Sequence, residues 1–96
     1  MGSLRQLHAV IRGRVQGVGF RYNAREAAQR LSLNGWVRNL ADGTVETVAV
    51  GPQNALETYL NWLHEGPPGA RVAAVDADWA DSSQTFTTFE IRHGYD

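Results

Sequence analysis

The chain contains no lysine and no cysteine among its 96 residues. Without cysteine it has no disulfide scaffold, thiolate zinc site or cysteine nucleophile. Without lysine it has no Schiff-base chemistry and no P-loop lysine, and every fixed positive charge is a planar guanidinium. Nine arginines are nearly balanced by ten acidic residues, for a formal net charge of -1. The sequence therefore lacks the basic excess with which a general nucleic-acid binder neutralises phosphates.

Long apolar runs are also missing. No stretch approaches the ~18 apolar residues of a membrane-spanning helix, and the first six residues lack the apolar run of an export signal. We therefore expect a cytoplasmic protein with no membrane partner. The length fits one domain, residues 1–96, with one core and with residues 1–6 flexible. Nothing in the sequence requires more than a monomer.

The first half of the sequence predicts a strand, a glycine-rich segment and a helix. Apolar residues alternate over residues 7–13, which favours a largely buried strand. Glycines then interrupt regular structure over residues 13–19. Apolar residues recur at three- and four-residue steps and predict an amphipathic helix over about Tyr22–Ser32. We expect Asn34-Gly35 to end this helix, because these residue types adopt positive φ most readily.

The second half adds a hairpin, a helix and two further strands. The β-rich runs 36–40 and 44–50 are joined through Asp42-Gly43, a typical hairpin sequence. Gly51-Pro52 precedes a helix with a regular apolar stripe. Runs with β character follow; they span Val72–Trp79 and Thr85–Arg92.

Two helices that each bury one stripe must share one face of an antiparallel sheet. The sequence therefore predicts an α+β fold, a ferredoxin-like βαββαβ sandwich with a short extra C-terminal strand.

The segment between the first strand and the first helix has the composition of an anion site. Glycines allow backbone N–H groups to converge there, and the helix adds the positive end of its dipole. Arg21, at the helix entry, can donate two parallel hydrogen bonds to a phosphoryl group. The segment matches neither a P-loop nor a dinucleotide fingerprint. By spacing alone, a tight turn with a solvated Arg21 explains it equally well.

Two motifs are more specific. Residues 13–21 read Gly-Arg-Val-Gln-Gly-Val-Gly-Phe-Arg, and they resemble the first signature of the acylphosphatase family. Residues 35–39 read Gly-Trp-Val-Arg-Asn. Together with Gly43, Val45 and Gly51, they match that family's second signature. The similarity is close over about residues 7–65 and looser beyond Arg71. The tail after Arg92 has no motif to compare.

The resemblance implies hydrolysis of the carboxyl–phosphate bond of a small acyl phosphate, with inorganic phosphate as a product and with no metal or organic cofactor. It implies that Arg21 binds the phosphoryl group and that Asn39 orients the attacking water. It also implies that backbone amides of the loop bind the phosphoryl group; these belong to Val15, Gln16, Gly17, Val18 and Gly19. We expect Asn39 to reach the loop because the second and third strands would flank the first.

Other interpretations remain open from the residues alone. The same sandwich can serve as a non-catalytic anion-sensing domain or as an RNA-recognition domain, but the RNA function needs exposed aromatic residues on the central strands, and the first strand has none. His8, His64 and His93 lack the spacing of metal ligands, so we expect no metal site. Asp76 and Asp78 share one strand face, where we expect solvated carboxylates.

Overall fold

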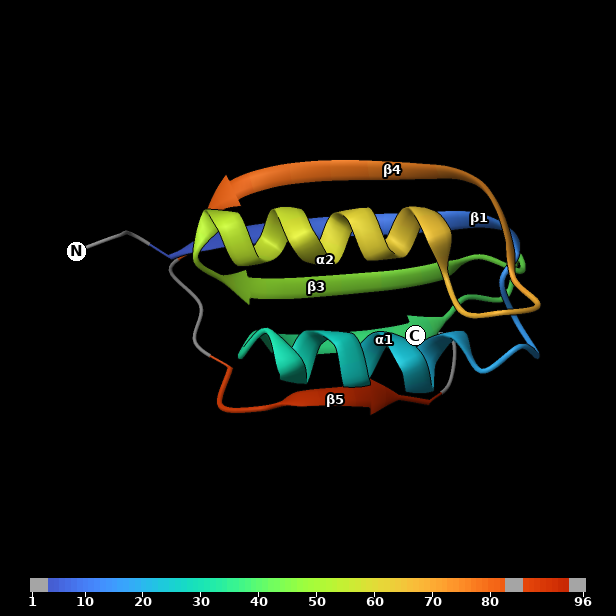
Figure 1. Cartoon of the computed structure of the whole chain (residues 1–96), viewed down its shortest axis with the longest axis horizontal. Helices are drawn as coiled ribbons and strands as arrows, with labels where there is room; N and C mark the ends of the chain where they lie inside the picture. Colours follow the sequence, from blue (N-terminus) through green and yellow to red (C-terminus); the bar gives the residue numbers. More distant parts are fainter. Residues whose placement is uncertain (1–3, 83–85, 94–96) are drawn as a thin grey trace.

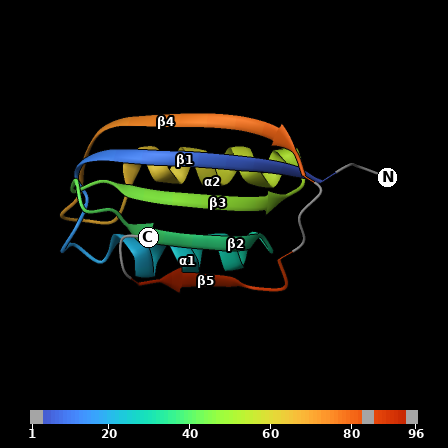
Figure 2. The same ribbon diagram turned by 180° about the vertical axis from the view of Figure 1, so that it is seen from behind.

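The computed structural model describes residues 4–82 and 86–93. Its elements follow one another in the order β1 (Arg5–Arg14), α1 (Phe20–Arg30), β2 (Asn34–Asn39), β3 (Val45–Gly51), α2 (Gln53–Glu65), β4 (Arg71–Asp81) and β5 (Phe89–Arg92). The strands form one sheet in the order β4-β1-β3-β2-β5. Both helices cover one face of the sheet (Figure 1), and the opposite face is uncovered (Figure 2). The predicted α+β ferredoxin-like sandwich with a short last strand is confirmed.

The strand neighbours differ from the prediction. Strands β2 and β3 do not both flank β1, because β1 lies between β3 and β4. The connection through α1 leaves one strand position between β1 and β2. Strand β3, which follows β2 in the hairpin, occupies that position. Strand β5 begins at the end of the sheet where β4 finishes, and therefore runs in the direction of β2. It pairs parallel with β2, Val37 opposite Ile91, so the sheet is not wholly antiparallel.

Two predicted boundaries also shift. Strand β1 begins at Arg5, two residues before the predicted start, and Arg5 and Gln6 pair with Gly51 and Val50 of β3. The last strand covers only the second half of the predicted run 85–92, and Thr85 lies outside the described residues.

Helix α1 ends differently from the prediction. Ser32 takes the left-handed conformation, with φ 58°. The amides of Ser32 and Leu33 donate to the carbonyls of Gln29 and Ala28 at 3.0 and 2.9 Å, which closes the helix with a Schellman arrangement. The Asn34-Gly35 pair instead opens β2. Gly35 is required there because a Cβ would lie 2.0 Å from the Val48 carbonyl oxygen.

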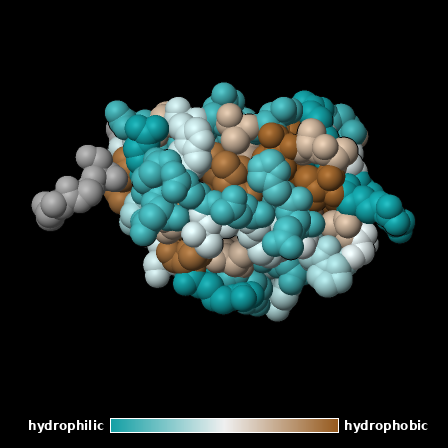
Figure 3. Space-filling model, turned by 45° about the horizontal axis from the view of Figure 1, so that its top comes forward, coloured by the Kyte–Doolittle hydropathy of each residue, from teal (hydrophilic) through white to brown (hydrophobic). Residues whose placement is uncertain are grey.

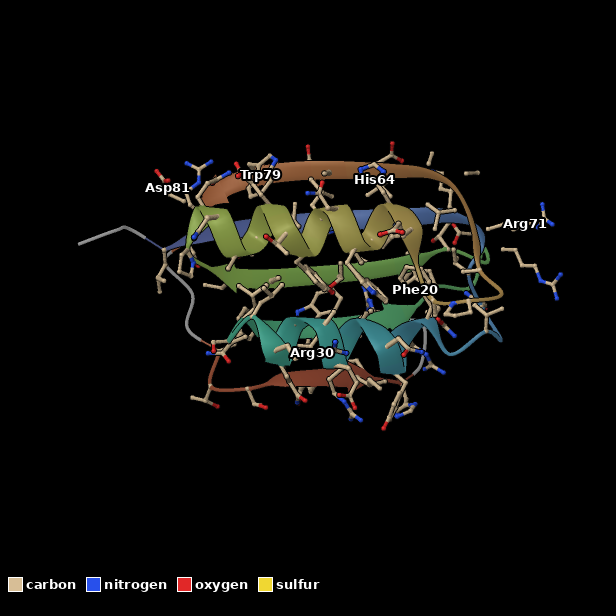
Figure 4. All side chains as sticks on the ribbon, viewed as in Figure 1. Phe20, Arg30, His64, Arg71, Trp79 and Asp81 are labelled. Carbon is tan, nitrogen blue, oxygen red and sulfur yellow. The ribbon has the colours of Figure 1, made fainter. Side chains whose placement is uncertain are left out.

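The core lies between the helices and the covered face of the sheet. Alternate residues of β1 and β3 point into it, as do the apolar stripes of both helices. Phe20 lies between the two helices (Figure 4). Its ring meets that of Trp62 edge to face, with centroids 5.3 Å apart, and so joins α1 to α2. Seen from the side of β4 and α2, the surface carries small apolar patches separated by hydrophilic residues (Figure 3).

A chain of buried hydroxyls crosses this core. The Tyr59 and Thr47 oxygens are 2.9 Å apart, and the Thr47 hydroxyl donates to the Trp36 carbonyl at 2.8 Å. The Tyr59 hydroxyl must therefore donate to Thr47. Burial raises the pKa of Tyr59, and the hydrogen bond with Thr47 offsets only part of that rise. Tyr59 thus stays neutral and ties α2 to the middle of the sheet.

The uncovered face is occupied by internal charge pairs. Glu46 lies 2.7 Å from both His8 and Arg38. Desolvation raises the pKa of Glu46, but hydrogen bonds from His8 and Arg38 outweigh it and hold the pKa below its usual value. The Trp36 ring carries the guanidinium groups of Arg38 and Arg92 at 5.2 and 4.8 Å. The Trp36 ring on this face is therefore already in contact with two arginines.

The buried hydroxyl chain makes a prediction about stability. Thr47→Val leaves the Tyr59 hydroxyl buried without an acceptor and is expected to cost about 2–3 kcal/mol. Tyr59→Phe removes only one hydrogen bond and is expected to cost about 1 kcal/mol. Urea unfolding midpoints measure both losses. Equal losses, or a larger loss for Tyr59→Phe, would contradict the assigned direction of donation.

Candidate active site

A cavity of about 170 Å³ opens where the segment after β1 meets the start of α1 and the ends of β2 and β5. The residues that line it are Val15, Gly17, Gly19, Phe20, Arg21, Tyr22, Asn39, Ile91 and His93. The structure thus brings together Arg21 and Asn39, although β3 separates β2 from β1. Of the five loop residues implied by the resemblance, Val15, Gly17 and Gly19 line the cavity, whereas Gln16 and Val18 do not.

The start of α1 presents uncapped amides to this cavity. Gly17 and Gly19 both have φ 76°, a left-handed conformation that glycine adopts without strain. Gly19 is the N-cap residue of α1, and no side chain of the described residues accepts a hydrogen bond from the first turn, which also contains no acidic residue. The first backbone N–H groups of a helix need such acceptors. An anion in the cavity would supply them.

The side chain of Gln16 joins the loop to the β2–β3 turn. Its Nε2 donates to the carbonyl oxygens of Leu40 and Thr44, at 2.7 and 2.9 Å. The turn itself is closed by Asp42, whose Oδ1 accepts from the Thr44 hydroxyl at 2.6 Å and from its amide at 3.1 Å. These two hydrogen bonds lower the pKa of Asp42. Asn39, next to Leu40, is therefore held in a fixed position relative to the loop.

Arg21 has no charge partner among the described residues. Within residues 4–82 and 86–93, Arg21 has no carboxylate within ion-pair distance, whereas Arg12 pairs with Asp76 at 2.8 Å and Arg38 pairs with Glu46. No described residue that lines the cavity is acidic. A guanidinium and uncapped helix amides without a nearby negative charge favour an anionic ligand.

Four residues that line the cavity were not predicted as site residues: Phe20, Tyr22, Ile91 and His93. Ile91 lies in β5 and His93 follows that strand; the pairing of β5 with β2 brings both residues to the same cavity as Asn39. No local pattern in the sequence indicates that pairing. Tyr22 follows Arg21 directly and lies off the apolar stripe of α1, a signal that could have identified it.

The remaining polar residues lie elsewhere. Asp76 and Asp78 are exposed on the uncovered side of β4, as expected, and Asp76 pairs with Arg12. In the described part of the chain, no group of three or more histidines, aspartates and glutamates could hold a metal ion. No helix of that part is long and apolar enough to cross a membrane.

Comparison with known proteins identifies the family. The family model described as Acylphosphatase matches residues 7–91. The chain belongs to the acylphosphatase family. An acylphosphatase of Salinibacter ruber is 50% identical over 91 residues, which cover 95% of this chain and 96% of the relative. One of Acaryochloris marina is 51% identical over 85 residues, covering 88% and 90%. Membership of this family gives the general activity of the protein, which is a hydrolase that acts on acyl phosphates.

Solved acylphosphatases share the fold. The crystal structure of the Bacillus subtilis enzyme superimposes with a TM-score of 0.89 at 38% identity, over 92% of this chain and 98% of that one. A full-length HypF, in a phosphate- and nucleotide-bound form, contains the same fold with a TM-score of 0.86 at 25% identity, over 96% of this chain but only 12% of its own. The acylphosphatase fold therefore occurs both alone and as a module of a larger protein.

The Gln16 bridge makes a prediction about the site. Gln16→Ala is expected to lower the rate of acyl phosphate hydrolysis by roughly 10²-fold, because small displacements of positioning groups have costs of that size. The loss in unfolding free energy is expected to be only about 1 kcal/mol, since the Leu40 and Thr44 carbonyls keep backbone donors. Rates and unfolding midpoints are measured together. Gln29→Ala, at an exposed position of α1, is the control and should match the wild type.

Proposed function

We propose that the protein hydrolyses the carboxyl–phosphate bond of small acyl phosphates with its own groups alone, without metal or organic cofactor. Arg21 and the amides of residues 15–19 hold the phosphoryl group, and Asn39 aims the attacking water. The observation that carries the proposal is the meeting of Arg21, Asn39 and the uncapped start of α1 in one cavity.

The reaction needs one bond to form and one to break. The water oxygen bonds to phosphorus, and the bond between phosphorus and the acyl oxygen breaks, with its electron pair leaving on the carboxylate. One water proton ends on a phosphate oxygen. An acyl phosphate dianion and water thus give a carboxylate and dihydrogen phosphate, with atoms and charge conserved.

The leaving group explains why so few residues suffice. A carboxylic acid has a pKa of about 4, so the departing oxygen needs no proton from a general acid. In agreement with this, no described residue that lines the cavity is a carboxylic acid that could act as a general acid. Phosphoryl transfer then depends mainly on position and on stabilising charge over the equatorial oxygens.

Arg21 and the loop amides supply that stabilisation. The guanidinium donates two parallel hydrogen bonds, and the amides at the start of α1 add donors that need no reorientation during the reaction. Each such donor is worth about 3 kcal/mol in comparable oxyanion sites. No described carboxylate competes for Arg21, so its full charge is available to the substrate.

Asn39 positions the water without removing its proton. A side-chain amide has no useful basicity, but its carbonyl oxygen accepts a hydrogen bond and its NH₂ group donates two. The substrate phosphate therefore takes the proton, directly or late in the reaction. The Gln16 bridge supports this role because it fixes the Asn39 backbone against the loop that holds the phosphorus.

The uncovered sheet face does not favour an RNA-binding function. Its aromatic residue, Trp36, lies on β2 and is covered by Arg38 and Arg92. The two central strands, β1 and β3, present His8 and Glu46 to each other there instead of stacking platforms. A non-catalytic anion sensor is distinguished from a hydrolase by turnover.

The role of Arg21 is tested by substitution. Arg21→Ala is expected to lower kcat/KM for benzoyl phosphate by about 10²–10³-fold, because a donor to the developing charge is lost. Arg21→Lys should recover little, since an ammonium cannot reproduce the planar fork. Hydrolysis is followed by the loss of benzoyl phosphate absorbance in the presence of a metal chelator. The exposed Arg30→Ala is the control and keeps the wild-type rate. Wild-type rates in both Arg21 variants would refute the proposal.

The role of Asn39 is tested by separating binding from turnover. Asn39→Ala is expected to lower kcat by roughly 10²-fold because the water is no longer aimed. The inhibition constant of inorganic phosphate should stay within about twofold, since the donors to the phosphate remain. The exposed Asn61→Ala serves as the matched control. An equal loss of phosphate binding and kcat would place Asn39 among the phosphate ligands instead.

A further inference from the structure

The cavity, of about 170 Å³, has walls besides those proposed to hold the phosphoryl group. Its phosphate end is accounted for by the loop, Arg21 and Asn39. We infer that Tyr22 and Ile91, on the remaining wall, form a subsite for the acyl group and select apolar or aromatic acyl groups over small ones. The inference rests on the proposed function, because it concerns the other half of the same substrate.

Tyr22 has no role in the core that would explain its place. The stripe that α1 buries includes Phe20, Ala24 and Ala27, and Tyr22 lies off this stripe. Its side chain is 54% exposed, and among the described residues the only other large apolar side chain exposed to this degree is Leu4. An exposed aromatic ring at the mouth of a cavity offers a flat apolar surface to a ligand.

The Tyr22 ring is also held in place. The guanidinium carbon of Arg25 lies 5.1 Å from the ring centroid, within the range of a cation–π contact. Arg25 follows Tyr22 by three residues, so both side chains lie on the same side of α1. A ring restrained before binding loses less conformational entropy when an acyl group packs against it.

Ile91 extends the apolar wall from the sheet. Its neighbour two positions earlier, Phe89, points to the same face and is buried against Tyr59, with ring centroids 5.9 Å apart. Ile91 is only half-buried, because it is one step nearer the end of the sheet, where the cavity opens. Helix α1 packs against β5, which brings Tyr22 and Ile91 to one cavity from opposite layers.

The polar groups of the cavity determine the orientation in which the substrate binds. A phosphoryl group held by Arg21 and the loop amides occupies the side of the cavity that can donate hydrogen bonds. The acyl group must then extend along the apolar part of the wall, which consists of the Tyr22 ring face and Ile91 together with the buried Phe20 and Val15. An acetyl group is too small to bury much of this wall, whereas a benzoyl ring can pack on Tyr22. His93 is the remaining polar residue at the rim.

The ratio of kcat/KM for benzoyl phosphate to that for acetyl phosphate tests the subsite. Tyr22→Ala is expected to lower this ratio by roughly three- to tenfold, the size of one lost aromatic contact. The loss should fall on benzoyl phosphate, with acetyl phosphate turnover and inhibition by inorganic phosphate unchanged. Tyr22→Phe should keep the wild-type ratio because it keeps the ring. Ile91→Val should lower the ratio by about twofold, since part of one methylene contact is removed.

Leu4→Ala is the matched control, because Leu4 is similarly exposed but lies outside the cavity, at the start of β1. The ratio of kcat/KM for benzoyl phosphate to that for acetyl phosphate should be the same in Leu4→Ala as in the wild type. An unchanged ratio in Tyr22→Ala, or equal losses with both substrates, would overturn the subsite and leave the proposed function intact. A wild-type protein that hydrolyses neither substrate would instead refute the proposed function itself.

Discussion

The candidate site depends on the two hydrogen bonds that the Gln16 side chain donates to the carbonyls of Leu40 and Thr44. The loop follows β1 and the turn follows β2, and β3 lies between these strands, so no backbone ladder joins the two segments directly. One amide side chain makes that connection. It joins the turn next to Asn39 to the loop that precedes Arg21, and in the proposed function this connection fixes where a water and a phosphorus atom meet.

The same region departs from the usual rules of helix stability. Helix α1 begins at a glycine in the left-handed conformation, has no acidic residue in its first turn, and receives no capping side chain from the described part of the chain. Arg21 has no described carboxylate as partner, although other arginines of the sheet do. In the proposed function, one phosphoryl group would satisfy both features. Local rules are often broken at functional sites in this way.

The sequence predicted the elements better than their arrangement. The apolar spacing from Phe20 to Leu31 located α1 within two residues, and the two motifs pointed to Arg21 and Asn39, which share the cavity. The neighbours of each strand could not be read from local patterns, because alternation shows which face is buried but not which strand lies beside it. The parallel pairing of β5, and with it the presence of Ile91 and His93 in the cavity, depends on the path of the whole chain. The need for glycine at position 35 likewise arises from the close approach of Val48.

Strand β5 gives the two ends of the cavity unequal resistance to local opening. It has four residues, lies at the edge of the sheet and pairs with β2 alone. Short edge elements open at lower free energy than the centre of a fold. The Ile91 side of the cavity can therefore detach while Gln16 still holds Asn39 against the loop. In such a partly opened molecule the groups proposed for hydrolysis would stay in place, whereas the proposed acyl subsite would be lost.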